Sequence, residues 1–249
     1  MSVGLILELD IGNTRSKWRL LDNGQSLALG ALDTAALKRG ELPVAWSDIR
    51  PQRLRAANVA GETVADALAA LARDRFGLEA EFARVQADCA GVTCGYRKPG
   101  GLGVDRWLAV LAAHRLDPRA ALIVDCGSAV TLDLLDTGGR HLGGYILPGL
   151  GPMRRALYSD TDAVKVREIR SPGMSLAPGR DTGEAVNRGL PLMVMGAVEH
   201  ALAELRRTAG SEPLLWLTGG DGEFFSSLFP RPHELVPELV LDGLALSNP

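Results

Sequence analysis

A short pattern that occurs twice constrains the fold of this chain more than any other feature. An apolar run leads into Asp10-Ile11-Gly12-Asn13, and about half a chain later another apolar run leads into Asp125-Cys126-Gly127-Ser128. A second match follows each corner: Leu20–Gly24 reads LLDNG and Leu134–Gly138 reads LLDTG, with an offset of one residue. Turns commonly carry Asp, Gly and Asn, so each match alone could arise by chance. Two matches in the same order favour an internal duplication, in which each half begins with a hairpin that has an Asp-x-Gly corner.

Hydrophobic periodicity predicts the secondary structure of the first half. Short apolar runs bounded by turn residues indicate strands, whereas apolar positions three or four residues apart indicate helices. Gly77 and the dipeptide Asp117-Pro118 are stop signals for two of the helices. We expect strands over 3–9, 16–21, 26–32, 53–61 and 79–85, and helices over 62–77 and 104–116.

The second half repeats the strand-rich beginning. Residues 120–149 read as strand, Asp-x-Gly bend, strand, Gly-rich turn and strand. Residues 181–210 predict one long helix or two, kinked near Pro191. A buried strand over 213–222 ends in a Gly-Gly-Asp turn, and 238–246 reads as a terminal strand or helix. Strands that alternate with helices predict an α/β protein.

Composition limits the classes of protein that remain. The 249 residues are enough for two domains, which we expect over 1–117 and 118–249. A net charge of −3 disfavours nucleic-acid binding, and no apolar stretch reaches membrane-spanning length. The N-terminus has no export signal, and the three cysteines fit buried thiols in a reducing compartment, so we expect a cytoplasmic location. The four scattered histidines do not support a zinc site.

The first Asp-x-Gly corner has the residue types of a phosphate site. Gly12, Asn13 and Thr14 at a tight bend can turn several backbone N–H groups to one side, which forms a concavity for an anion. The Thr14 hydroxyl adds a donor, and Lys17 could reach a phosphate as a point charge. Asp10 would repel a bare phosphate, so its carboxylate fits only with a cation, and Mg²⁺ held by one carboxylate and waters meets that need. The alternative is a plain turn with a solvated Asp10.

The second corner favours the phosphate interpretation over the plain turn. Gly127 and Ser128 offer a second phosphate contact on the other half of the duplication, as a nucleoside triphosphate would need. A third Gly-rich corner, LTGGDG over 217–222, is as consistent with a tight turn as with a nucleotide contact. The chain has no G-x-x-x-x-G-K-[ST] motif and no G-x-G-x-x-G after a strand, which disfavours a P-loop enzyme and a dinucleotide site.

Taken together, six segments make the chain resemble the type III pantothenate kinases. In the order found in that family, the chain contains DIGNTRSKW, YRKPGGLGVDRW, DCGSAVTLD, GGYILPGL, DTGEAVNRG and LTGGD, from residue 5 to about residue 222. Each segment alone is weak evidence, and the ordered set is strong. The family belongs to the acetate and sugar kinase/Hsp70/actin superfamily. The resemblance therefore implies two duplicated RNase H-like domains, with mixed sheets flanked by helices and ATP in the cleft between them.

The same resemblance implies roles for individual residues. Asp10 lies near Mg²⁺, and the first phosphate motif consists of Asp10, Ile11, Gly12, Asn13, Thr14, Arg15, Ser16 and Lys17. Asp125 matches the ligand of a monovalent cation, K⁺ or NH₄⁺. Ser128 matches an ATP contact that is usually threonine in the family, and the hydroxyl is retained. Asp105 is the implied proton acceptor, and the implied pantothenate contacts are Tyr96, Gly103, Val104, Asp105, Arg106 and Thr182.

General chemistry is compatible with these roles, although each has a structural alternative. A primary hydroxyl needs a carboxylate to take its proton late in phosphoryl transfer, yet Asp105 could simply cap the helix that begins there. Arg106 could bind the substrate carboxylate through its planar guanidinium, or be a solvated helix residue. Tyr96 could form a wall of the site or anchor its loop. Thr182 follows an aspartate at a helix start, where capping is equally natural. The family pattern favours function in each case.

We therefore expect an ATP-dependent kinase that converts pantothenate to 4'-phosphopantothenate, the first step of coenzyme A biosynthesis, and a homodimer as in the family. One alternative is a phosphotransferase or phosphohydrolase of the same superfamily that acts on another small substrate. Another is a non-catalytic nucleotide-binding regulator, because proteins that resemble this family have been treated as accessory regulators of transcription. The retained Asp10 and Asp105 disfavour the regulator. The apolar segment 190–205 could be interface or core, and core is the default.

Overall fold

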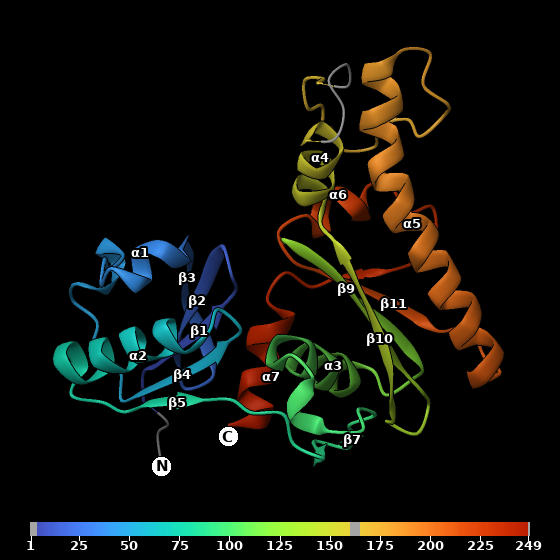
Figure 1. The fold of residues 1–249 in the computed structure, drawn as a ribbon. Helices are drawn as coiled ribbons and strands as arrows, with labels where there is room; N and C mark the ends of the chain where they lie inside the picture. The colour runs from blue at the N-terminus through green and yellow to red at the C-terminus, as the bar shows by residue number, and fades with distance from the viewer. Residues whose placement is uncertain (1–3, 160–164, 249) are drawn as a thin grey trace. The chain divides into compact units, whose positions relative to one another are not determined.

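The computed structural model describes residues 4–159 and 165–248, which form two compact units. The first unit comprises the described residues within 1–90, 97–112 and 239–249, and the second comprises those within 91–96 and 113–238. Each unit has its own five-stranded sheet with helices packed against it (Figure 1). The predicted α/β class with two mixed sheets is confirmed.

The sheet of the first unit begins with the predicted meander. β1 (Ile6–Ile11), β2 (Arg15–Asp22) and β3 (Gln25–Asp33) are consecutive antiparallel strands. Asn23 and Gly24 both have positive φ, as a two-residue hairpin turn requires. β4 (Arg53–Asn58) pairs in parallel with β1, and β5 (Ala80–Phe82) in parallel with β4, which gives the order β3-β2-β1-β4-β5.

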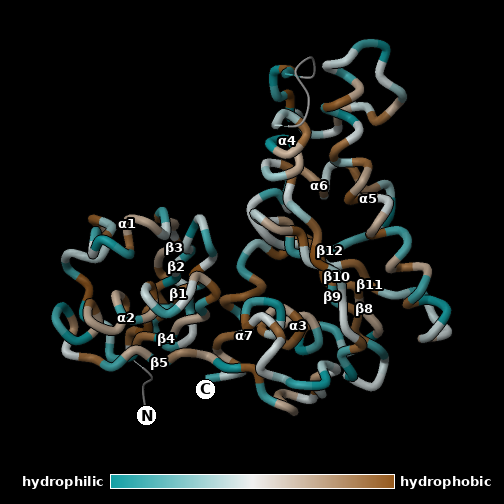
Figure 2. The backbone as a smooth tube through the Cα atoms, viewed as in Figure 1, coloured by the Kyte–Doolittle hydropathy of each residue, from teal (hydrophilic) through white to brown (hydrophobic). Residues whose placement is uncertain are grey.

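Helices lie against both faces of this sheet. Leu7, Leu9 and Ile11 of β1 pack into a core with α2, and α7 contacts β1 and β4. Figure 2 shows the apolar segments gathered around the sheet. The remaining elements of the unit are α1 (Thr34–Lys38), a 3₁₀ turn (Val44–Trp46), α2 (Glu62–Leu71) with a π-helical extension (Ala72–Phe76), β6 (Asp88–Cys89), a 3₁₀ turn (Pro99–Gly101), α3 (Val104–Leu116), whose last turn belongs to the second unit, and α7 (Leu239–Ser247).

The second unit is built on the same plan. Its strands are β8 (Ala121–Cys126), β9 (Ala129–Leu135), β10 (His141–Pro148), β11 (Leu214–Thr218) and β12 (Glu234–Leu235), in the order β10-β9-β8-β11-β12. The long helix α5 packs its buried face on β8 and β9 and forms the main core of the unit. The other elements are β7 (Val92–Thr93), α4 (Leu150–Ser159), α5 (Thr182–Ala209) and α6 (Gly222–Ser226).

Details of register show that the two sheets are duplicates. β1 and β8 have the same burial pattern, and Asp10 and Asp125 are each the fifth residue of their strand. A β-bulge interrupts each hairpin at the equivalent place, between Leu20 and Leu21 in one and opposite Leu134 and Leu135 in the other. The bulged residues of the third strands, Leu27 and Leu142, are both exposed. Such matching bulges support the predicted duplication.

The offset of one residue between the halves has a structural cause. In the first hairpin, Ile11 pairs with Ser16, so four residues form the corner. In the second, Cys126 pairs with Val130, so the corner has three residues. We propose that the duplicated halves meet near Asp117-Pro118, directly before β8.

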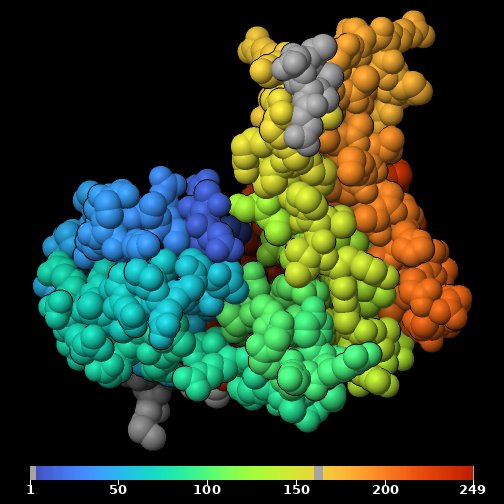
Figure 3. All heavy atoms as spheres, in the orientation of Figure 1, coloured from blue at the N-terminus to red at the C-terminus, as the bar shows by residue number. Residues whose placement is uncertain are grey.

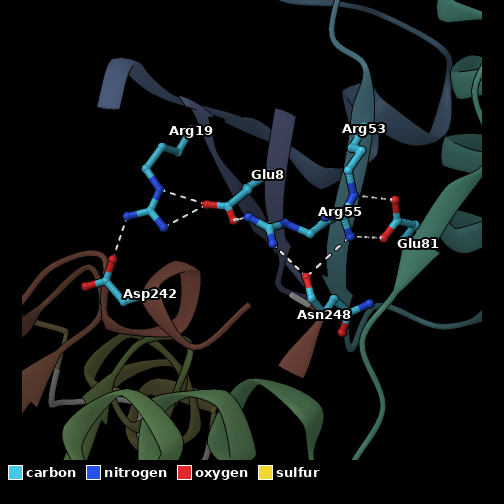
Figure 4. A network of polar contacts seen from close by, with 7 residues as sticks. All are labelled: Glu8, Arg19, Arg53, Arg55, Glu81, Asp242 and Asn248. Atoms are coloured by element: carbon cyan, nitrogen blue, oxygen red, sulfur yellow. Dashed lines mark hydrogen bonds and ion pairs between the residues drawn. The ribbon is translucent and has the colours of Figure 1, made fainter. Parts of the chain in front are cut away.

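The first unit also contains a network of charged side chains that joins α7 to the sheet (Figure 4). Glu8, which is fully buried, forms ion pairs with Arg19 and Arg55, each at 2.7 Å. Arg19 also pairs with Asp242 of α7 at 2.6 Å, and Arg55 donates to the carbonyl oxygen of Asn248 at 2.6 Å. Two arginines of the sheet therefore hold both ends of the C-terminal helix.

Several sequence predictions need correction in their bounds. The first strand begins at Ile6 and extends to Ile11, rather than covering 3–9, of which residue 3 lies outside the described residues. Residues 182–209 form one helix with Pro191 inside it, and the C-terminal segment is a helix. Gly77 ends its helical segment in the left-handed conformation, as predicted. No helix among the described residues is both long and apolar enough to cross a membrane.

Candidate active site

Strand alternation divides the first phosphate motif between two faces of its sheet. Asp10 and Lys17 are directly paired across β1 and β2, so their side chains share one face. Ile11 and Ser16 are paired next to them and point to the opposite face, where both are fully buried. Asp10 and Lys17 can therefore offer side chains to a ligand, whereas Ile11 and Ser16 can offer only backbone.

The corner between these strands is fixed from a third element. The Ser16 hydroxyl lies 2.9 Å from the Thr34 hydroxyl, which in turn donates to the carbonyl oxygen of Gly12 at 2.7 Å. The Thr34 amide donates to the carbonyl oxygen of Thr14, and the Gly12 amide to that of Arg15. Thr34, which the sequence reasoning missed, thus sets the shape of the loop, while Asn13, Thr14 and Arg15 are exposed on it.

Asp105 lies in the first turn of α3, where its carboxylate is held by backbone. Its Oδ1 accepts from the amide of Arg106 at 2.8 Å, and the amide of Trp107 donates to the carbonyl oxygen of Gly103. A Cβ on Gly103 would come within 2.6 Å of Asp105 Oδ1, so glycine leaves room for the carboxylate. This contact with the backbone and a reactive role are compatible, because a carboxylate has more than one acceptor position.

Arg106 is not the solvated helix residue of the structural alternative. Its residue exposure is 5%, and Trp107 beside it is fully buried. A buried guanidinium has to be compensated by acceptors, so its position is fixed more tightly than that of a surface arginine. Val104 is half-buried and begins the helix.

At the second corner, the LTGGD segment packs against the DCGSAVTLD segment. The turn after β11 packs directly on Asp125: Gly219 has φ +88°, and a Cβ there would overlap Asp125 Oδ1. The amide of Asp221 donates to the carbonyl oxygen of Cys126 at 2.8 Å. Burial, with the charges of Asp125 and Asp221, raises the pKa of the Cys126 thiol well above its usual value, so this cysteine is an inert core thiol. LTGGD is thus part of the Asp125 corner.

Close backbone packing also fixes the loop that carries Ser128. The amide of Gly149 donates to the carbonyl oxygen of Ser128 at 3.0 Å. A Cβ on Gly149 would overlap the carbonyl oxygen of Gly127, so only glycine fits at position 149. The GGYILPGL segment therefore packs directly against the backbone of the second corner. The Ser128 residue is exposed.

Thr182 begins α5 beside an open pocket. Asp181 is the N-cap and accepts from the amide of Glu184 at 2.8 Å, so capping falls to Asp181 and leaves the exposed Thr182 at the rim. The pocket has a volume of about 710 Å³, and apolar side chains form much of its wall. Its lining includes Leu157, Thr182, Val186, Leu190 and Met193.

The sequence reasoning missed Asn187, which ties α5 to Arg154 of α4 and to the backbone of residues 167–169. Asn187, almost fully buried, accepts from Arg154 at 2.8 Å and from the amide of Ile169 at 3.0 Å. Its amide group donates to the carbonyl oxygens of Arg167 and Gly183. The available signal was spacing: Asn187 stands three residues before Leu190 and seven before Val194, on the apolar side of the predicted helix, where a polar side chain must find several partners.

Tyr96 belongs to a segment of the second unit that is docked on the β9–β10 hairpin. The Thr93 amide donates to the carbonyl oxygen of Gly139 at 2.9 Å. The Tyr96 ring is half-buried and stacks on the ring of His141, with centroids 5.9 Å apart and an interplanar angle of 15°. Both readings of Tyr96, loop anchor and site wall, are consistent with this placement.

The donors in the first corner fit a magnesium ion that arrives with a nucleotide. No group of three His, Cys, Asp or Glu side chains within residues 4–159 and 165–248 is arranged to hold a metal ion by itself. Asp10, half-exposed beside Lys17, supplies one hard carboxylate donor. Mg²⁺ characteristically takes one or two carboxylates and completes its shell with water and substrate phosphates.

Comparison with known proteins gives one consistent family. The model of the type III pantothenate kinase family matches residues 6–204. A type III pantothenate kinase from Chromohalobacter salexigens is 40% identical over 247 residues, which cover 98% of this chain and 88% of that protein.

Similarity to solved structures extends to proteins of other names. A Campylobacter jejuni protein, described as a candidate Baf family transcriptional activator, has a TM-score of 0.63 at 22% identity, covering 96% of this chain and 95% of its own. A candidate 2-dehydro-3-deoxygalactonokinase from Sinorhizobium meliloti has a TM-score of 0.57 at 15% identity, with 97% of each chain covered. At these identities the similarity concerns the fold alone.

Proposed function

Because the chain belongs to the type III pantothenate kinase family, we propose that it transfers the γ-phosphoryl group of ATP to the primary hydroxyl of pantothenate. The products are ADP and 4'-phosphopantothenate, and the reaction is the first step of coenzyme A biosynthesis, which we place in the cytoplasm. One observation carries the proposal: the family match spans residues 6–204 and includes both Asp10 and Asp105.

The first corner binds the phosphates of ATP. Gly12, Asn13 and Thr14 contribute the loop, and Lys17 contributes a positive charge on the same sheet face as Asp10. Phosphoryl transfer depends mainly on positioning and charge neutralisation, so a rigid loop and a fixed cation are the contributions it needs. Asp10 holds Mg²⁺, which neutralises phosphate charge when bound. Ser128 gives a further hydroxyl contact to ATP.

Asp105 takes the proton of the attacking hydroxyl. Its carboxylate is oriented by the Arg106 amide, and Gly103 lets it lie close to the backbone. Arg106 binds the carboxylate of pantothenate, because a buried guanidinium favours a planar anionic partner. Gly103, Val104, Tyr96 and Thr182 complete the contacts to pantothenate.

A monovalent cation, K⁺ or NH₄⁺, binds at Asp125. The Gly219 backbone packs against this carboxylate, and backbone carbonyls are suitable further ligands for such an ion. Replacing potassium by sodium should therefore lower kcat, and this dependence should disappear in Asp125→Asn.

An ADP-release assay tests the proposed activity. With Mg²⁺, potassium and ample ATP, we expect ADP to form only when pantothenate is added. ADP release that is independent of pantothenate would indicate a phosphohydrolase of the same fold. No turnover with any small alcohol, together with tight ATP binding, would indicate the nucleotide-binding regulator.

The protein acts as a homodimer, and α5 supplies the contact. One face of α5 is in the core, but Leu192 and Met193 on another face are 54% and 62% exposed. Figure 3 shows α5, in orange, open along one side of its unit. These two neighbouring apolar side chains on the long helix are the contact that we assign to the partner subunit.

Mass measurement by light scattering tests the dimer. We expect twice the chain mass of 26.4 kDa for the wild type and 26.4 kDa for Met193→Glu, since a buried charge would oppose association. Leu29→Glu is the matched control, because Leu29 is 54% exposed in the first unit and should leave the dimer intact. A monomeric wild type would contradict the proposal.

A further inference from the structure

A histidine that the proposed reaction does not use lies beside Tyr96. His141 is the first residue of β10 and is fully buried. Its Nε2 lies 2.9 Å from Oδ1 of Asp133 in β9, whose side chain is 2% exposed. We assign the Nε2–H of His141 as the donor of this hydrogen bond and the Asp133 carboxyl oxygen as its acceptor. A buried carboxylate without a hydrogen-bond donor would destabilise the fold, so Asp133 favours the ring orientation in which Nε2 faces it. Asp133 therefore fixes the edge of the His141 imidazole that points to β9.

The Tyr96 ring stacks on a face of the same imidazole. The two rings are nearly parallel, with centroids 5.9 Å apart and an interplanar angle of 15°. An offset stack of this kind defines the plane of the tyrosine ring as well as its position. The orientation of Tyr96 therefore depends on that of His141, which in turn depends on Asp133.

The backbone near His141 restricts the same segment. A Cβ on Gly95 would overlap the carbonyl oxygen of His141, so the chain directly before Tyr96 lies against the start of β10. Two residues before Gly95, Thr93 forms a parallel bridge with Arg140. Tyr96 thus follows a docked segment, and Arg97 and Lys98 after it are exposed.

We propose that His141, oriented by Asp133, is a positioning residue that holds the Tyr96 ring in the conformation that binds pantothenate. The inference rests on the proposed contact between Tyr96 and pantothenate. An apolar residue at position 141 would fill the space, but it would lack the hydrogen bond that fixes the plane of the ring. This requirement accounts for a polar pair inside the second unit.

Steady-state kinetics give the first test. His141→Ala should raise the KM for pantothenate about tenfold, the upper range for one aromatic stack, and leave the KM for ATP and kcat within about twofold. Tyr96→Ala should have a similar effect, and the double variant should be no worse than Tyr96→Ala alone. Asp133→Ala should resemble His141→Ala, whereas Asp133→Asn should restore a low KM, because its amide oxygen still accepts from Nε2.

Limited trypsin digestion without substrates gives a second test that does not depend on activity. Cleavage after Arg97, detected by mass spectrometry as the fragment 1–97, should be faster in His141→Ala and Asp133→Ala than in the wild type or Asp133→Asn. His233→Ala is the matched control, because His233 also has a side-chain hydrogen bond, to Ser226, and an aromatic neighbour, Phe229. It should leave both the cleavage rate and the KM for pantothenate unchanged.

Three results would overturn the inference. The first is an unchanged KM for pantothenate in His141→Ala. The second is an equal rise in the KM for both substrates, as a general structural defect would cause. The third is an unchanged KM in Tyr96→Ala, which would remove the contact on which the inference rests. Failure of the proposed function is a different observation, namely that the wild type releases no ADP in response to pantothenate.

Discussion

Asp105→Asn should lower kcat about a thousandfold, which is within the usual range for the loss of a general base. Asparagine is nearly isosteric and keeps an oxygen that can accept from the Arg106 amide, so the start of α3 should be preserved. It cannot take a proton from the attacking hydroxyl. Binding of ATP to the variant should therefore remain close to that of the wild type, and isothermal titration beside steady-state kinetics would separate the two effects.

The control for this variant is Asp117→Asn, the same substitution just beyond the other end of α3. Asp117 pairs with Arg119 at the surface, and this ion pair lowers the pKa of the Asp117 carboxyl. Because exposed pairs contribute little to stability, we expect nearly unchanged kinetics. If Asp105→Asn kept near-normal turnover, Asp105 would not be the proton acceptor, and its role would be restricted to the helix start.

Glu8→Gln should cause the largest loss of stability, about 3–5 kcal/mol, or roughly 10 °C in Tm, because it leaves the buried Arg55 guanidinium without its carboxylate. Arg55 is the more sensitive partner. Burial lowers its pKa, and the charge of Glu8 opposes that effect. The substitution removes the opposing charge while the burial remains. Asp242 still pairs with Arg19, so α7 should be weakened on the Arg55 side first.

Thermal denaturation with a matched control tests this network. Glu81→Gln makes the same change in the same sheet, where Glu81 pairs with Arg53 at 2.7 Å, but both side chains are about one-third exposed. Glu81→Gln should lower the free energy of unfolding by less than about 1 kcal/mol, because solvent screens a partly exposed ion pair. Equal losses in the two variants would contradict the claim that burial makes Glu8 critical.

Local patterns in the sequence were enough to predict most of the two sheets. Strand periodicity, Gly77 and Asp117-Pro118 carry their information within a few residues. The duplication was also visible, and the structure explains its offset of one residue by the shorter second corner. The bounds of the strands were predicted less well. The last residues of β1, Asp10 and Ile11, belong to the candidate site, and the charged Asp10 ends the apolar run that indicates a strand.

The candidate site was harder to predict where it depends on distant partners. Alternation alone could have indicated that Ile11 and Ser16 point away from Asp10 and Lys17. Nothing near Ser16 in the sequence indicates Thr34, which lies in the next helix and determines the shape of the loop. Likewise, the partners of Glu8 come from two other strands, and α7 joins them from the far end of the chain.

The roles of the pantothenate contacts, of Asp105 as proton acceptor and of Asp125 as cation ligand came from resemblance rather than from physical reasoning. Asp105 accepts from the amide of the residue after it, and this geometry alone would not distinguish a proton acceptor from a residue that only stabilises the helix start. The burial of Arg106 could be recognised only in the structure, because an arginine in the first turn of a helix is usually exposed. The His141–Asp133 pair was invisible in the sequence, since an isolated histidine and aspartate eight residues apart have no motif.

Identification of the phosphorylated product tests the central claim most directly. The purified protein should be incubated with ATP, Mg²⁺, potassium and pantothenate, and the product analysed by mass spectrometry and phosphorus NMR. We predict a single new phosphomonoester coupled to a primary CH₂ group of pantothenate, formed in equal amount with ADP and absent with Asp105→Asn. Inorganic phosphate as the main product, or a phosphoryl group on any other position, would contradict the account.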